Sequence, residues 1–152
     1  MKTFFSLSFL LFFSCQASSS WKYYERKIYT SQPATRFLRH LSSDDFSGLE
    51  LLFIREGSEL QLYLNSRLTA FPIWEGDENK SSCLLHIEGG EKRVVGKRAK
   101  EGRQLIFPQA AARTIVNALK KGKRVTFSVE EEQLVVGSRG FGAHYKKLLR
   151  KR

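Results

Sequence analysis

The sequence predicts an α+β domain, made mostly of antiparallel β-strands in a sandwich-like or curved sheet. Residues 48–65 hold two strand-like segments around a short polar turn, and the second segment alternates apolar and polar side chains, which is typical of a β-hairpin with one buried face. Residues 108–121 carry apolar side chains at helical spacing instead. The chain has 152 residues, which even without a signal segment is enough for one domain and too few for two. We therefore predict a signal segment over 1–14, a tether over 15–34 and a single domain over 35–152.

The chain begins with an apolar run of the export-signal type. Lys2 precedes ten mostly apolar residues, Phe4 to Phe13. A membrane-spanning helix needs about 20 apolar residues, so this run is too short to span a bilayer. The stretch FFSLSFLLFFSC resembles the bacterial lipoprotein signal, in which a small residue precedes a lipid-bearing cysteine. Ser14 takes the small position and Cys15 is the predicted lipid-attachment residue, although Phe12 replaces the Leu that this pattern prefers.

Two processing routes are open for this segment. Cleavage after Ala17, with Cys15 and Ala17 as the two small residues, would release a secreted protein. Lipidation would anchor the protein in a membrane. Stable anchoring takes two or more acyl chains, because each buried methylene contributes only about 0.8 kcal/mol. The resemblance to diacylglyceryl lipoproteins implies that Cys15 would carry these acyl chains. Gln16 in place of Asp after the cysteine implies sorting to the outer membrane, facing the periplasm.

Residues 16–34 are predicted to be a polar tether. They place Trp21 and three tyrosines among charged side chains, with neither clean alternation nor a helical stripe. Aromatic rings are favoured at the level of lipid headgroups. These rings are therefore expected to dock either on the membrane or on the domain.

Two hairpins are predicted after the tether. The first joins Leu49–Arg55 to Leu60–Asn65, where the leucines of the second strand alternate with polar side chains. The second joins Cys83–Glu88 to Lys92–Lys97. The Gly-Gly pair between these strands allows the positive φ that a tight turn requires.

The clearest predicted helix covers residues 108–121. Pro108 is tolerated in a first helical turn, and Gly122 suits the end of a helix. One amphipathic stripe has the spacing i, i+3, i+4, i+7 and is predicted to be buried: Ala112, Ile115, Val116 and Leu119.

The rest of the chain is predicted to form two strands and a short C-terminal helix. The strands are Arg124–Val129 and Gln133–Val136. The helix covers Phe141–Leu149, and four of its side chains are predicted to face inward: Phe141, Tyr145, Leu148 and Leu149.

Residues 103–149 resemble the invasion-associated locus B type of periplasmic domain. The resemblance rests on the order LIFP, AAARTIVNALKKGK, VTFSV, LVVGS and RGFGAHYKKL, with an "ALKxGxxxT" spacing in the helix. It implies a mostly β domain of the cell envelope that binds or supports something, with no catalytic residues to carry over. That family often carries cysteines around the strands before the helix. Cys83 is the one cysteine there in this chain, which argues against a disulfide-stabilised core.

Few residues suggest catalysis. His40, His86 and His144 are widely spaced, and no two stand at the i, i+4 spacing of a zinc-binding helix. We predict no metal and no cofactor. The glycines of GSRGFG lie where phosphate-binding loops occur, but a tight strand-to-helix turn explains them better than a dinucleotide fingerprint does. Cys83 paired with a histidine is the alternative, and it would make the protein an envelope hydrolase or thiol enzyme.

Charge is distributed unevenly along the chain. The formal net charge is +11, yet residues 16–91 carry eight Lys and Arg against eleven Asp and Glu. Residues 92–152 carry seventeen against four. This basic half suits anionic lipid or an acidic protein partner. The candidate contact residues are Lys120, Lys121, Lys123, Arg124, Lys146, Lys147, Arg150, Lys151 and Arg152.

Together these features predict a non-catalytic binding or assembly module, anchored in the cell envelope by Cys15. An export signal makes nucleic acid a less favoured ligand than it would be for a cytosolic protein of this charge. A secreted, basic, nucleic-acid-binding protein is the other alternative, and it requires cleavage after Ala17.

Overall fold

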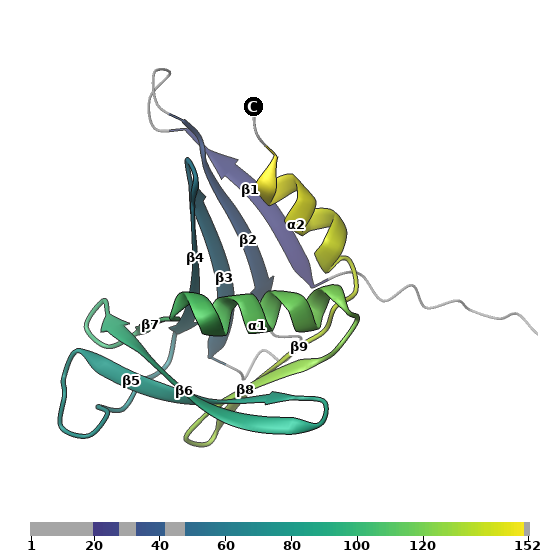
Figure 1. The fold of residues 1–152 in the computed structure, drawn as a ribbon. Helices are drawn as coiled ribbons and strands as arrows, with labels where there is room; N and C mark the ends of the chain where they lie inside the picture. Colours follow the sequence, from purple (N-terminus) through teal and green to yellow (C-terminus); the bar gives the residue numbers. More distant parts are fainter. Residues whose placement is uncertain (1–19, 28–32, 42–47, 151–152) are drawn as a thin grey trace, which may run out of the picture.

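Nine antiparallel strands form one continuous, open and strongly curved sheet in the computed structural model of the chain, which describes residues 20–27, 33–41 and 48–150 (Figure 1). Two short helices complete an α+β domain. The strands are β1 (Trp21–Arg26), β2 (Thr35–Leu41), β3 (Leu49–Glu56), β4 (Glu59–Ser66), β5 (Lys80–Ile87), β6 (Gly90–Ala99), β7 (Gln104–Ile106), β8 (Val125–Val129) and β9 (Glu132–Val136), and the helices are α1 (Gln109–Lys120) and α2 (Phe141–Leu149).

The order of strands in the sheet is β1-β2-β3-β4-β7-β6-β5-β8-β9. β1 to β4 follow one another in sequence and in space. The next three strands run back, so that the three-residue β7 pairs with both β4 and β6. Ile106 therefore faces Tyr63 on one side and Lys97 on the other. β7 joins two halves of the sheet, and β8 and β9 extend the second half beyond β5.

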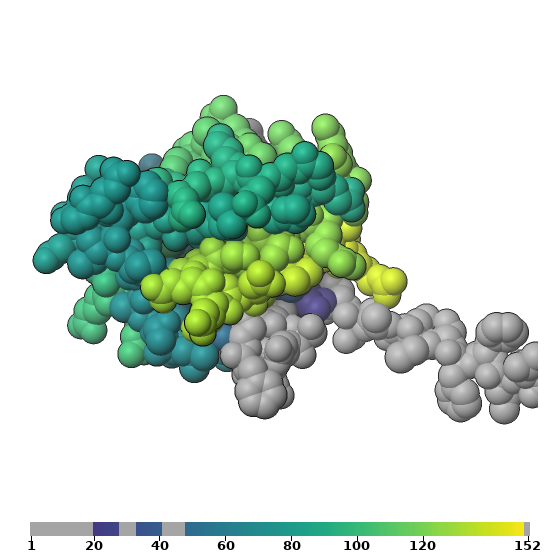
Figure 2. All heavy atoms as spheres, turned by 90° about the horizontal axis from the view of Figure 1, so that it is seen from below, coloured from purple at the N-terminus to yellow at the C-terminus, as the bar shows by residue number. Residues whose placement is uncertain are grey.

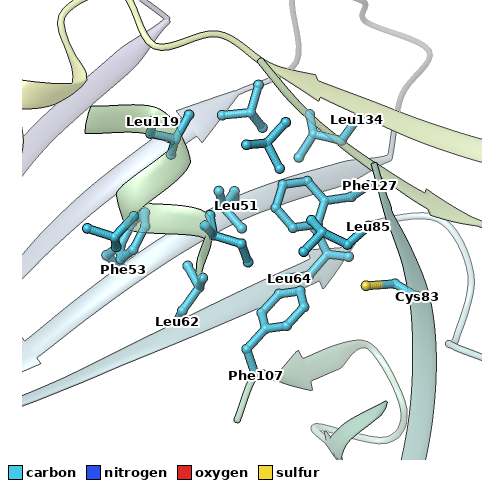
Figure 3. Packing of buried hydrophobic residues seen from close by; sticks show 14 of the residues in the cluster. Leu51, Phe53, Leu62, Leu64, Cys83, Leu85, Phe107, Leu119, Phe127 and Leu134 are labelled. Atoms are coloured by element: carbon cyan, nitrogen blue, oxygen red, sulfur yellow. The ribbon is translucent and has the colours of Figure 1, made fainter. Parts of the chain in front are cut away.

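The core lies on the inner face of the curved sheet. Alternate side chains of each strand point there, as the period of two requires. Leu51 and Phe53 of β3 meet Leu85 of β5 and Phe127 of β8 in one cluster with Leu119 of α1, as Figure 3 shows. Each of these side chains is almost fully buried, and full burial of such a side chain contributes about 1.5–3 kcal/mol.

α1 lies in the angle between the two halves of the sheet, and α2 lies over β1 and β2 (Figure 1). Ile115, Val116 and Leu119 of the predicted stripe are buried, and Ala112 is partly buried against the core. Gly122 follows the helix with a φ of 77°. A positive φ at this position is the common way for a helix to end.

The prediction that Leu149 faces inward is wrong. Phe141, Tyr145 and Leu148 of α2 are buried, whereas Leu149 is 39 % exposed. Successive residues of an α-helix point about 100° apart, so Leu149 turns away from the face that Leu148 presents.

The boundary predicted between tether and domain at residue 35 is also wrong. Residues 21–26 form β1, which pairs with β2 along its whole length. Trp21 is 3 % exposed and contacts the rings of His40, Phe53 and Phe141. The folded domain therefore includes Trp21, and every described strand and helix lies between this residue and Leu149.

The predicted signal segment, Cys15, the alternative cleavage point at Ala17, and the tail residues Lys151 and Arg152 lie outside the described residues. Within the described ranges, no helix has the length and apolar character that would be needed to cross a membrane.

Candidate functional site

The two helices carry basic side chains but no acidic ones. Lys120 ends α1, and Lys146 and Lys147 stand exposed in the last turn of α2. Lys120 Nζ lies 5.0 Å from the centre of the Tyr145 ring, within the range of a cation–π contact. This contact joins the C-terminal end of α1 to α2. Two basic segments that are more than twenty residues apart in sequence therefore lie side by side.

We define the helix face as the exposed basic residues at the C-terminal ends of the two helices: Lys120, Lys121, Lys146, Lys147 and Arg150. All five are exposed. Cations near the C-terminal end of a helix also stabilise the helix dipole, so part of their role is structural.

Two arginines of the sheet donate hydrogen bonds to backbone carbonyl oxygens at the C-terminal end of α2. Arg36 Nη1 donates to the Arg150 carbonyl oxygen, and Arg55 Nη1 donates to the Leu148 carbonyl oxygen at 3.1 Å. Arg36 is buried and also forms an ion pair with Glu25 at 3.2 Å. These arginines therefore hold α2 on the sheet, and they are not counted in the helix face.

A second basic surface is an open cleft of about 620 Å³ between the α1–β8 and β9–α2 connections. His86 and Thr126 face each other across β5 and β8 and form its floor. The residues that line it are His86, Glu88, Gly122, Arg124, Thr126, Gly137, Ser138 and Arg139. Arg124, which was predicted to act with the lysines at the end of α1, is one of these lining residues.

Trp21 fixes one wall of the cleft. Its Nε1–H donates to the Gly137 carbonyl oxygen at 2.8 Å, and its ring centre lies 4.9 Å from that of Phe141. The described chain enters the domain at this wall, next to the turn between β9 and α2 (Figure 1). The view from below shows purple atoms of the N-terminal segment beside the yellow C-terminal part (Figure 2). Trp21, the first residue of β1, is therefore held at the cleft.

The glycine-rich stretch GSRGFG forms the turn from β9 into α2. Gly140 precedes the helix with a φ of 77°, a conformation that glycine adopts without strain. The Phe141 N–H donates to the Ser138 carbonyl oxygen at 2.9 Å and closes the turn. Arg139 is thereby placed at the cleft.

Sequence reasoning missed His86 and Arg139 as members of this site. They are about fifty residues apart and are brought together by the pairing of β5 with β8 and by the turn after β9. The available signal was weak. It consisted of a polar residue in an apolar strand and an arginine between two glycines.

Cys83 lies on the inner face of β5, in the core, and is 1 % exposed (Figure 3). Burial raises the pKa of its thiol to about 12, although Arg93 exerts a smaller opposing effect. A nucleophilic cysteine needs access and a lowered pKa. The geometry therefore gives the thiol-enzyme alternative no support.

The three histidines occupy separate places. His40 is buried beside Trp21, and burial lowers its pKa to about 4. His86 is exposed in the cleft, and His144 lies on α2. Within the part of the chain that the structure describes, no three His, Cys, Asp or Glu side chains are grouped as metal ligands would be.

Comparisons of the chain with models of protein families, with curated proteins and with solved structures gave no match, so its function is inferred from its own geometry and chemistry.

Proposed function

We propose that this protein is a non-catalytic binding module of the cell envelope, anchored through Cys15 in the outer membrane and facing the periplasm. Its helix face holds an acidic segment of a protein partner. The lipoprotein-type signal supports the anchor, and the resemblance over residues 103–149 supports an envelope domain that binds or supports another component.

The contact between Lys120 and Tyr145 carries this proposal, because it brings the basic end of α1 against α2, which carries the second basic cluster. No acidic residue occurs from 102 to 129 or after Glu132, so the two helices themselves supply no carboxylate to neutralise this surface. A concentrated positive surface attracts an acidic partner, raises the association rate and disfavours basic partners. Screening limits this attraction to about 8–10 Å at ordinary salt.

The helix face can be tested with a polyglutamate peptide as the acidic probe. We expect Lys146→Gln with Lys147→Gln to weaken peptide binding by roughly fivefold, because exposed ion pairs contribute about 0.5 kcal/mol each. A matched control is Lys92→Gln with Lys97→Gln, which removes two exposed charges from β6. The measurement is a fluorescence titration at low and moderate salt.

Equal weakening by the two pairs would contradict a defined contact on the helices. A single-stranded DNA probe tests the nucleic-acid alternative in the same titration. DNA binding that is tighter than peptide binding, with a steep salt dependence, would favour that alternative.

A further inference from the structure

The cleft beside Trp21 has the chemistry of a phosphate site. Arg124 and Arg139 provide guanidinium groups, which match phosphate oxygens with two parallel hydrogen bonds. Thr126 and Ser138 add hydroxyl donors. Glu88 is the one carboxylate among the residues that line the cleft, so the lining is positive overall.

The cleft is also open where a ligand would approach the backbone. Gly122 and Gly137 lie on its walls, and no atom stands within 4 Å of where a Cβ would be on either residue. His86, Arg124 and Arg139 are all exposed. A phosphate group can therefore reach these side chains without rearrangement of the core.

The place of the cleft favours a headgroup over free phosphate. Trp21 bonds to the wall of the cleft and is six positions from Cys15. A chain of that length spans at most about 20 Å when fully extended. If Cys15 is anchored, the cleft is held within this distance of the headgroups around the anchor.

We propose that this cleft binds the phosphate of an anionic phospholipid headgroup in the bilayer to which the chain is tethered. The proposal rests on the anchor at Cys15 given under the proposed function. Binding at the cleft orients the domain, because the anchor and the headgroup then fix it at two neighbouring points.

The first test uses the chain from Gln16 to Arg152, which keeps every described strand and helix. The indole N–H of Trp21 reports on the cleft through its bond to Gly137, and Trp74 serves as the internal reference. We expect short-chain phosphatidylglycerol to shift the Trp21 indole signal in an NMR titration, and short-chain phosphatidylcholine to shift it much less. An equal shift with inorganic phosphate alone would identify free phosphate as the ligand and overturn the proposal.

The second test measures sedimentation of the same chain with vesicles that contain phosphatidylglycerol. Arg124→Gln with Arg139→Gln should weaken binding roughly thirtyfold. Lys146→Gln with Lys147→Gln removes the same charge from the helix face and should weaken it no more than about threefold. Circular dichroism checks that both variants are folded.

Equal losses of vesicle binding in the two double variants would overturn the proposal that the cleft is the binding site, because binding would then depend only on the total charge of the protein. Equal binding to vesicles whose negative charge comes from a fatty acid would do the same. The anchor at Cys15 is tested independently of the cleft. An unmodified mature chain beginning at Ser18 would refute the anchor and would leave the vesicle result unchanged.

Discussion

His40 is a titratable side chain that the fold keeps in its neutral form. It is 4 % exposed, its ring centre lies 4.8 Å from that of Trp21, and burial lowers its pKa from 6.5 to about 4. Between these two values the unfolded chain binds a proton that the folded chain excludes. The stability that depends on neutral His40 is therefore complete above pH 6.5 and is lost as the pH falls toward 4.

We expect acidification from pH 7 to pH 5 to lower the free energy of unfolding by roughly 2 kcal/mol through this residue. Urea titrations at the two pH values measure the change. The His40→Gln variant should be less stable at pH 7 but much less sensitive to pH over this interval. An equally steep pH dependence in the variant would mean that other groups are responsible.

α1 shows how much of a local element can be deduced from periodicity. The helix lies within the predicted residues 108–121, and three of the four stripe residues are buried. The two hairpins, β3–β4 and β5–β6, were also placed by alternation and turn residues. Local rules suffice for these elements, because neighbours in sequence provide the contacts.

Leu119 provides the test of helix packing, because it is 2 % exposed within the core. Leu119→Asp would bury an unpaired carboxylate, so the variant should unfold or fail to accumulate. Asn117→Asp adds the same charge at an exposed position of α1 and should remain folded. Thermal unfolding followed by circular dichroism compares them, and equal melting temperatures would refute the packing described.

The rest of the fold depends on contacts between distant residues. β1 was missed because six residues with mixed side chains give a short pattern, and the burial of Trp21 depends on Phe53 and Phe141 far along the chain. The pairing of β5 with β8 likewise has no local signal. Basic clusters on the helices could be listed from the sequence, but the cleft could not, because it needs that pairing.

The cleft and the helix face are two basic surfaces among the residues that the structure describes. The cleft lies at the wall where Trp21 enters the domain, and the helix face lies where Lys120 meets Tyr145. In the arrangement we propose, the cleft contacts the membrane and the helix face contacts a partner. The charge excess of the C-terminal half then has two separate uses.

The attachment itself is tested on the mature protein. We expect it to begin at a diacylated Cys15 and to partition into detergent, because two or more acyl chains anchor a protein stably. Intact-mass measurement identifies the N-terminal residue and its modification. Cys15→Ser should leave the protein unprocessed or released from the membrane, and unchanged detergent partitioning of this variant would contradict the anchor.

β7 has a consequence for the way in which the chain folds. Its three residues fill the place between β4 and β6, yet β4 ends at Ser66 and β7 begins at Gln104. During synthesis, the edge of β4 therefore stays unpaired until a strand that follows almost forty residues later has been made. Pairings over such sequence separations form slowly, because the loop must close before the contacts form. The first four strands therefore remain an incomplete sheet with an open edge until β7 has been synthesised.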